Sequence, residues 1–388
     1  MKIEPFRPLF YSDGVEKFVA PPFDTLSERQ IRELKSRDHN ILQLFYEDGS
    51  TPKSRLEEWI REKVLVEDDE QSFVILTQRF LHNGVQHERI GVIGAVDLNE
   101  KQFGLRPHEM TFPESVKQRR GIFIKLETQM EPLLVLSPEV SLERVLSQSV
   151  TGLTPRMRFQ EPLGVLNSVF TVSDPDRIGL IQSVLGKQIG MIADGHHRLK
   201  AIESINGDYH RDFRALSYVT SLFSDSIFIS GINRVVSARI QTDQAIAGIS
   251  EYFDLIPEKR ASPRMRMILY DGSLNSLVMN HRGEEMLKKL NIKPQAVTCV
   301  SDLLILRNIL NIDTDPAIKE VEFTAHDHVA IDAVDSGQAS LALLMPPWEK
   351  DHFINIVNEG ILLPQKSTYF YPKIPAGLVL YRMKHETA

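Results

Sequence analysis

The sequence predicts an α+β protein in which a mixed sheet carries helices and a second α/β region follows. Short apolar segments typical of strands alternate with amphipathic segments typical of helices along most of the chain. With 388 residues the chain is longer than one hydrophobic core usually organises, and its hydrophobic content of 42% suffices for a large interior. We therefore expect two regions: residues 1–238, with an N-terminal extension and insertions, and residues 239–388, whose last strand packs back on the first region.

In the first region we expect strands and helices to alternate at short spacing. The pattern predicts a helix that starts near Ser27, with Gln30 as its capping-box partner, and a helix over 199–205 that stops at Gly207. Further helices are expected at 53–67, 142–148 and 174–185, and a helix-like basic run at Lys117, Arg119 and Arg120. Residues 3–11 are expected to be extended, and strands are expected at 73–76, 90–96, 132–136, 163–171, 187–193, 215–222 and 227–229, with a hairpin near Asn83-Gly84.

The second region shows the same alternation. We expect helices at 242–252, 283–290 and 348–359, and strands at 267–270 and 340–344. The single cysteine, Cys299, lies in an apolar run and is expected in the core. The triplet His326-Asp327-His328 has no further ligands at metal spacing nearby, which favours a solvated loop over a metal site.

Composition excludes several classes of function. The net charge of −7 argues against broad contact with a nucleic acid backbone, because such contact requires a basic face. The apolar runs stop well short of the roughly 20 residues that a spanning helix needs, and the N-terminus lacks a signal-peptide core. One cysteine cannot form an internal disulfide, which favours a reducing cytoplasm. We expect a cytoplasmic protein without a membrane or nucleic-acid partner, and a homodimer is compatible with the sequence.

The stretch Asp194-Gly195-His196-His197-Arg198 is expected at a strand-to-helix turn, because an apolar run precedes it and a helical pattern follows. At such a turn Gly195 lets the backbone approach a ligand, the first-turn N–H groups favour an anion, and Arg198 can bind two phosphate oxygens. Asp194 can cap the helix or face a metal ion. The turn is therefore a candidate for binding nucleotide phosphates. The alternative is a capped helix with surface histidines and no ligand.

A second candidate group is Arg106-Pro107-His108-Glu109. Phosphorylation of a hydroxyl requires a group that accepts the hydroxyl proton and a cation that neutralises the developing charge. Glu109 fits the first role, with His108 beside it, and Arg198 fits the second. The alternative for Glu109 is a solvated carboxylate or a cap of the next helix.

Three further residues are candidate contacts to the substrate or to phosphate: Asp24, Lys366 and Ser367. Asp24 precedes a predicted helix, so its alternative is a helix cap. Lys366 and Ser367 belong to the stretch 363–373, in which lysines and hydroxyls occur among aromatic residues. Such residues bind a carboxylate or phosphate, or else form an ordinary half-buried strand.

Both boxes resemble the active-site boxes of the archaeal ADP-dependent free-serine kinases, which belong to the ParB/sulfiredoxin-like superfamily. Arg106–Glu109 is similar to their Lys-Pro-His-Glu box, with Arg for Lys, and Asp194–Arg198 matches their Asp-Gly-His-His-Arg box in full. The order is the same, but the interval between the boxes is longer here. The resemblance implies a ParB/sulfiredoxin-like catalytic core, a glutamate that deprotonates the acceptor hydroxyl and a box that binds the phosphates of ADP or ATP.

The whole chain resembles the domain-of-unknown-function-1015 family, on residues 19–24, the two boxes and residues 363–373. It departs from the family at Asn233-Arg234, where a His-Arg pair is frequent, and the resemblance leaves Arg234 as a candidate contact to phosphate or substrate. Together the resemblances imply a kinase that transfers a phosphoryl group from ADP or ATP, with Mg²⁺, to a hydroxyl, with free L-serine as the favoured acceptor. One alternative is a ParB-like nucleotide switch without a small-molecule acceptor, although no helix-turn-helix with a basic recognition helix is evident. Another is an interaction protein that has lost its chemistry.

Overall fold

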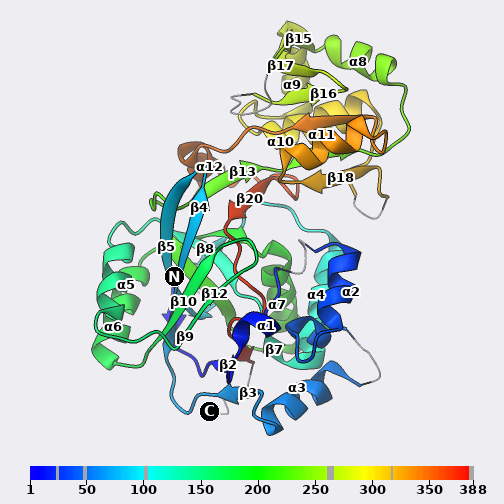
Figure 1. Cartoon of the computed structure of the whole chain (residues 1–388). Helices are drawn as coiled ribbons and strands as arrows, with labels where there is room; N and C mark the ends of the chain where they lie inside the picture. Colours follow the sequence, from blue (N-terminus) through cyan, green and yellow to red (C-terminus); the bar gives the residue numbers. More distant parts are fainter. Residues whose placement is uncertain (23–25, 47–49, 100–103, 260–265, 316–317, 384–388) are drawn as a thin grey trace. The chain divides into compact units, whose positions relative to one another are not determined.

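The computed structural model describes residues 1–22, 26–46, 50–99, 104–259, 266–315 and 318–383 (Figure 1). The chain divides into two compact units. Unit 1 comprises Met1–Pro107, Thr111–Ile227 and Pro372–Ala388, and unit 2 comprises His108–Met110 and Phe228–Tyr371. The first long segment thus ends before residue 238, because Phe228–Gly231 pairs with Thr368–Tyr371 inside unit 2.

Unit 1 is built on a mixed nine-stranded sheet, in the order β6-β11-β8-β12-β5-β4-β10-β9, with β1 beside β5. Two contacts, β8 with β12 and β6 with β11, are parallel, and the others are antiparallel. The strands are β1 (Ile3–Glu4), β4 (Phe73–His82), β5 (Val85–Val96), β6 (Leu105–Arg106), β8 (Leu133–Ser137), β9 (Met157–Gln160), β10 (Leu166–Val172), β11 (Gly190–Asp194) and β12 (Ala215–Ser221). Two small sheets pair β2 (Leu9–Tyr11) with β3 (Leu65–Glu67), and β7 (Thr128–Gln129) with β21 (Tyr381–Arg382).

The helices of unit 1 are α1 (Val15–Phe18), α2 (Glu28–Lys35), the 3₁₀ helix η2 (Ile41–Leu44), α3 (Pro52–Arg61), α4 (Pro113–Leu126), α5 (Leu142–Val150), α6 (Pro175–Leu185) and α7 (His196–Tyr209). Side chains of α4, α5, α6 and α7 join one core cluster with strand residues of the sheet, and in Figure 1 α5 lies beside α6. Helix α5 contacts β5, β10 and β12, whereas α7 contacts β8 and packs against α4. The capping box predicted for Ser27 and Gln30 is confirmed. Apolar side chains of β5, β8, β12 and the helices form one core cluster.

Several element boundaries in unit 1 differ from the predictions, including the ends of two helices. The helix expected at 53–67 ends at Arg61, because Leu65–Glu67 forms the strand that pairs with β2. Helix α7 does not stop at Gly207 but continues to Tyr209, where His210 in the left-handed conformation closes it. Gly207 faces open space and imposes no turn of its own.

Unit 2 contains an antiparallel six-stranded sheet, in the order β15-β17-β16-β19-β14-β18, and the separate pair β13 (Phe228–Gly231) and β20 (Thr368–Tyr371). The six strands are β14 (Asn233–Val236), β15 (Phe253–Pro257), β16 (Ile268–Tyr270), β17 (Leu274–Met279), β18 (Val321–Thr324) and β19 (Leu341–Leu344). The helices are α8 (Thr242–Ser250), α9 (His281–Leu290), α10 (Val297–Cys299), the π-helix η3 (Val300–Ile309), α11 (Asp327–Asp335) and α12 (Lys350–Asn358). The mixed α+β class is therefore confirmed.

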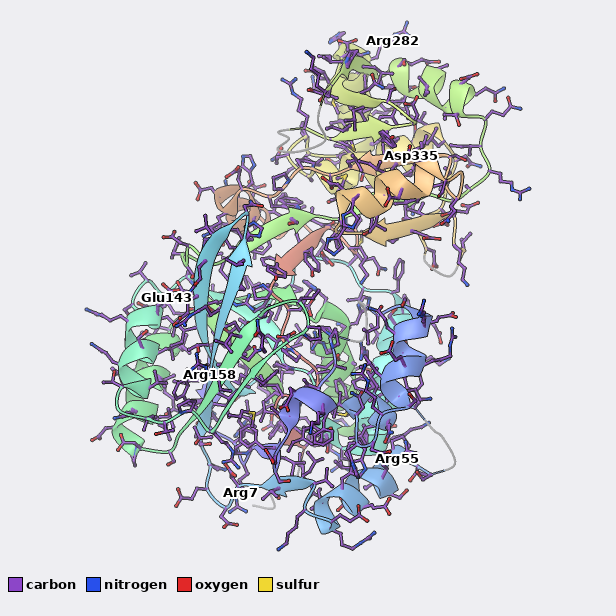
Figure 2. All side chains as sticks on the ribbon, in the orientation of Figure 1. Arg7, Arg55, Glu143, Arg158, Arg282 and Asp335 are labelled. Carbon is purple, nitrogen blue, oxygen red and sulfur yellow. The ribbon has the colours of Figure 1, made fainter. Side chains whose placement is uncertain are left out.

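Side-chain contacts in unit 2 settle two smaller predictions. Asp335, labelled in Figure 2, accepts a hydrogen bond of 2.7 Å from the Tyr270 hydroxyl, which ties α11 to β16. The same helix begins at Asp327, so the loop expected at 326–328 is the start of a helix. Cys299 is buried, as predicted, and burial raises the pKa of its thiol to about 11. Within the described ranges, no helix is both long and apolar enough to cross a bilayer.

Candidate functional site

The turn between β11 and α7 requires glycine. Strand β11 ends at Asp194, and Gly195 has a φ of 98°, a region that residues with a Cβ rarely adopt. A Cβ at Gly195 would also lie 2.6 Å from the Leu133 side chain. Gly195 is itself the N-cap residue of α7, and having no side chain it makes no side-chain cap hydrogen bond.

The Asp194 carboxylate instead lies between two cations. Its Oδ1 pairs with the Lys373 ammonium and its Oδ2 with the Arg198 guanidinium. Arg198 also donates a hydrogen bond of 2.8 Å to the Pro132 carbonyl and lies 3.9 Å from Glu131. The Asp194 carboxylate therefore holds a lysine and an arginine at the N-terminal end of α7.

Ion pairs extend outward from this helix end. Glu131 pairs with Arg119 at 3.2 Å, so the pairs among the described residues join three cations, Lys373, Arg198 and Arg119, with two carboxylates, Asp194 and Glu131. The positive end of the α7 dipole favours an anion at this point. The first hydrogen bond of the helix runs from the Leu199 N–H to the Gly195 carbonyl, so the amides of residues 196–198 precede the helical ladder.

The two histidines begin α7 and have different environments. His196 is buried, whereas His197 is partly exposed and accepts a hydrogen bond of 3.2 Å from the Phe112 N–H through its Nε2. Because that nitrogen acts as an acceptor, the ring proton resides on Nδ1. His197 thus ties the residue before α4 to the phosphate-binding candidate.

Direct metal binding by Asp194 does not fit this arrangement. Both carboxylate oxygens already pair with cations. The described part of the chain also contains no group of three or more His, Cys, Asp or Glu residues that suits a metal ion. Mg²⁺ commonly combines one or two carboxylates with the phosphates of its substrate. A Mg²⁺ ion at this turn would therefore be held by nucleotide phosphates.

Glu109 belongs to unit 2, where four donors of the 366–368 segment surround its carboxylate. Its Oε1 accepts hydrogen bonds from the Ser367 N–H (3.0 Å), the Thr368 N–H (2.9 Å) and the Thr368 hydroxyl (3.0 Å), and its Oε2 accepts one from the Lys366 N–H (3.2 Å). Lys366 has a φ of 58°, a left-handed conformation, so the three successive amides converge on one anion. A backbone bridge between Glu109 and Leu363 supports the arrangement.

His108 supports Glu109 from inside unit 2. The His108 ring is fully buried, and its Nε2 lies 2.8 Å from the Thr368 hydroxyl oxygen and 3.7 Å from Glu109 Oε1. The threonine donates its only proton to Glu109, so His108 Nε2 donates to the threonine. Phe353 and Phe370 pack edge-to-face on the ring. His108 therefore fixes the Thr368 hydroxyl.

Arg234 and Ser367 lie in the interior beneath the same segment. The fully buried Arg234 donates to both oxygens of Asp302, at 2.7 and 3.1 Å, and to the Lys366 carbonyl at 3.1 Å. The Ser367 hydroxyl donates to the Pro364 carbonyl at 2.6 Å and lies 2.9 Å from the Thr298 hydroxyl. Both side chains thus face protein groups.

The structure collects the predicted residues into two groups. Asp194, Gly195, His196, His197 and Arg198 form the turn in unit 1, whereas His108, Glu109, Arg234, Lys366 and Ser367 gather in unit 2. Asp24 lies outside the described residues. Sequence reasoning did not identify Asp302 or the partnership of Lys373 with Asp194. An isolated aspartate within the apolar run of η3 is the available signal for a buried partner of Arg234.

Among the solved structures that resemble part of this chain, we describe three, each 12% identical to it in sequence. A conserved hypothetical protein from Pyrococcus furiosus has a TM-score of 0.40, and the alignment covers 73% of this chain and 93% of that chain. A free serine kinase in complex with AMP has a TM-score of 0.40, with 74% and 92% covered. SbnI with a C-terminal truncation, from Staphylococcus aureus, has a TM-score of 0.43, with 76% and 90% covered. At TM-scores below 0.5 these similarities carry no conclusion about this chain.

Sequence comparison gives a firmer assignment. No curated protein matches the chain. The family described as "Protein of unknown function (DUF1015)" matches residues 3–301, which is more than half of the sequence. The chain therefore belongs to the DUF1015 family.

Proposed function

We propose that this protein is a phosphotransferase that moves a phosphoryl group from ADP or ATP to the hydroxyl of a small molecule, with free L-serine as the favoured acceptor. The observation that carries the proposal is the Asp194–Arg198 turn, where a lysine and an arginine lie together at a helix N-terminus. The resemblance of both boxes to those of the free-serine kinases supports the choice of reaction. On the same resemblance we propose a ParB/sulfiredoxin-like core for unit 1.

In the proposed reaction the acceptor oxygen attacks the terminal phosphorus of the donor. The bond from that phosphorus to the bridging oxygen breaks, and the nucleotide leaves as AMP from ADP or as ADP from ATP. The acceptor hydroxyl gives its proton to Glu109. Such transfers depend mainly on positioning and on neutralising charge. The α7 amides, His196, His197 and Arg198 are assigned to the donor phosphates, with Mg²⁺ supplying further charge neutralisation on the nucleotide.

Glu109 suits the role of base because its two oxygens differ. A carboxylate has about four acceptor sites. Three of the observed hydrogen bonds end on Oε1 and one on Oε2, so Oε2 retains more capacity for a substrate hydroxyl. We assign the proton to Oε2. The bonds to Oε1 fix the carboxylate plane, which is the preorganisation that general-base catalysis requires.

The other residues of unit 2 receive supporting roles in this proposal. His108 positions the Thr368 hydroxyl, while Arg234 and the Ser367 hydroxyl hold the segment whose amides bind Glu109. These three are positioning residues, since their polar atoms face the protein interior. The Lys366 ammonium is assigned to an anionic group of the acceptor or to the donor phosphates.

The test is phosphorus NMR with mass spectrometry on purified protein that contains Mg²⁺, ADP or ATP, and a panel of amino acids and polyols. We expect one acceptor, L-serine first, to yield a new phosphomonoester in proportion to the nucleotide consumed. Nucleotide hydrolysis with every acceptor left unmodified would instead support the switch function. Absence of nucleotide binding altogether would remove both functions.

A further inference from the structure

Three fully buried polar side chains form a row across the sheet of unit 1. They are Asn167 on β10, Gln78 on β4 and Arg89 on β5, and each stands directly opposite the next in the strand register. Gln78 Nε2 donates to Asn167 Oδ1 at 3.1 Å, and Arg89 Nη2 donates to Gln78 Oε1. The row is therefore continuous across three neighbouring strands.

The row ends on the main chain of the C-terminal segment. Arg89 Nη2 donates to the Pro372 carbonyl at 2.6 Å, and Gln78 Nε2 lies 3.2 Å from the Lys373 carbonyl as a second acceptor. Two successive carbonyls are thus fixed from the sheet. The side chain that leaves this fixed point is Lys373, whose ammonium pairs with Asp194 at the start of α7.

A contribution to folding alone does not account for Arg89. Burial lowers the pKa of its guanidinium although Tyr218 and the Glu161 carboxylate oppose that shift, and within the described part of the chain its Nε and Nη1 have no hydrogen-bond partner. Burying a charge with incomplete hydrogen bonding destabilises a fold, and apolar replacements of such groups are often neutral or stabilising. Because burying this polar row destabilises the fold, its presence points to a role in positioning the main-chain carbonyls that it binds.

We propose that Lys373 is a donor-phosphate ligand of the α7 turn, and that Arg89 and Gln78 are positioning residues that deliver its ammonium there. The inference rests on the proposed function, because it assigns a further contact to the same phosphates. An ammonium has three N–H donors and acts on phosphate as a point charge, so it can serve Asp194 and a phosphate oxygen together. The Lys373 side chain is 13% exposed, so a ligand can reach it.

The first experiment measures binding of inorganic diphosphate and of ADP, each with Mg²⁺, by calorimetry on the full chain. Lys373→Met is expected to weaken both about 10-fold to 150-fold, the usual range for a charge-assisted hydrogen bond. Lys373→Arg should recover most of the affinity. The matched control is Lys200→Met, which removes the same charge from an exposed position on α7, where Lys200 pairs with Glu203 at 3.2 Å. It should change affinity less than twofold.

A background variant separates direct contact from neutralisation of Asp194. If Lys373 acts only by neutralising that carboxylate, the effect of Lys373→Met should fall below threefold once Asp194→Asn has removed the charge, and the inference is then wrong. A loss of threefold or more in the Asp194→Asn background supports direct contact. When the unsubstituted protein binds diphosphate and Lys373→Met binds it as tightly as Lys200→Met, only this inference fails. When the unsubstituted protein binds neither ligand, the proposed function fails with it.

The positioning role has its own readout. Arg89→Met and Gln78→Met should each weaken diphosphate binding severalfold, and this loss should disappear in the Lys373→Met background, because the lysine they position is then absent. Additive losses would overturn the positioning role. The thermal midpoint and circular dichroism of each variant establish that it is folded, and whichever of the two substitutions leaves a folded protein suffices for the cycle.

Discussion

Asp194 and Glu109 are the two carboxylates that the sequence singles out, and the two units hold them by different means. Asp194 lies between the full charges of Lys373 and Arg198, whereas Glu109 accepts hydrogen bonds from three backbone amides and one hydroxyl. Side-chain substitutions can remove the charged partners of Asp194, but no substitution other than proline removes a backbone amide. Asp194 is therefore suited to organise cations around an anionic ligand, and Glu109 to remain fixed while it reacts.

The largest effect is expected for Glu109→Gln. Because a positioned general base contributes about 10²–10⁴-fold to such reactions, turnover should fall by that factor, while nucleotide affinity stays within a few-fold. Glutamine keeps the shape of the side chain and places an oxygen where Oε1 accepts its hydrogen bonds. The measurement is turnover by phosphorus NMR beside nucleotide affinity by calorimetry. Near-normal turnover in a folded variant excludes Glu109 as the base.

Arg198→Ala tests the charged partner of Asp194. We expect nucleotide affinity to fall about tenfold or more and the chemical step to slow as well, because a guanidinium on the transferring group acts on the ground state and the transition state together. The Pro132 carbonyl also loses a partner, so a lower thermal midpoint is expected. Calorimetric titration decides the matter: unchanged affinity places the phosphates elsewhere. Arg120→Ala, on α4 and paired with Asp208, is the matched control.

The turn at Asp194–Arg198 also shows which features of the structure can be predicted from the sequence. The turn was predictable, because an apolar strand, a glycine and a helical pattern are local features, and the structure has Gly195 at a φ of 98° between β11 and α7. The partners of the turn were not. Lys373 lies 179 residues after Asp194, and its place depends on buried hydrogen bonds to Pro372 and Lys373 from other strands. Periodicity carries no information about such distant contacts.

Unit 2 teaches the same lesson from buried polar groups. Arg234, Lys366 and Ser367 were predicted as direct ligand contacts, Arg234 from the family resemblance and the other two from their chemistry and neighbours in sequence. The structure shows Arg234 and the Ser367 hydroxyl buried among protein acceptors, with the Lys366 amide on Glu109. Residue type indicates that such a group needs a partner. It does not tell whether that partner is a ligand or another part of the chain.

Glu161 adds a third kind of carboxylate to the comparison. It has one amide donor, Asn167 at 2.7 Å, and burial raises its pKa to about 7 despite the nearby Arg89 charge. A carboxyl whose folded pKa lies above its unfolded value contributes stability that is complete below about pH 4.5 and is lost as pH rises through about 7. We expect the free energy of unfolding to fall on the order of 1–3 kcal/mol across that window.

Glu161→Gln should remove that part of the pH dependence, as measured by urea unfolding at pH 5 and pH 8. Glutamine keeps an oxygen to accept from Asn167 and carries no charge to desolvate. Glu114→Gln, at an exposed position on α4, is the control and should leave the pH dependence unchanged. An unfolding curve for Glu161→Gln that keeps the full pH dependence would show that Glu161 is solvated in the folded protein.

The glycine turn gives a smaller, purely structural effect. Gly195→Ala should lower the free energy of unfolding by roughly 1–3 kcal/mol, because alanine at this positive φ is strained and its Cβ would meet Leu133. Gly121→Ala is the matched control within α4, where a Cβ meets open space, and it should raise stability by up to about 1 kcal/mol. Thermal or urea unfolding distinguishes the two. Equal shifts in both variants would mean that the turn tolerates a Cβ.

Lys366→Met has the smallest expected effect on stability. It tests whether residue 366 acts through its ammonium or only through the backbone amide that binds Glu109. Methionine keeps the backbone amide that donates to Glu109 Oε2, so the carboxylate should stay in place and the free energy of unfolding should change by no more than about 0.5 kcal/mol. Catalytic efficiency should fall about tenfold if the ammonium contacts a substrate anion. Lys366→Arg, which keeps the charge, should recover part of that loss. Full activity in Lys366→Met with an unchanged thermal midpoint would restrict the role of residue 366 to its backbone amide. In this segment, Thr368 would then be the one position where a side-chain substitution removes a hydrogen bond to Glu109.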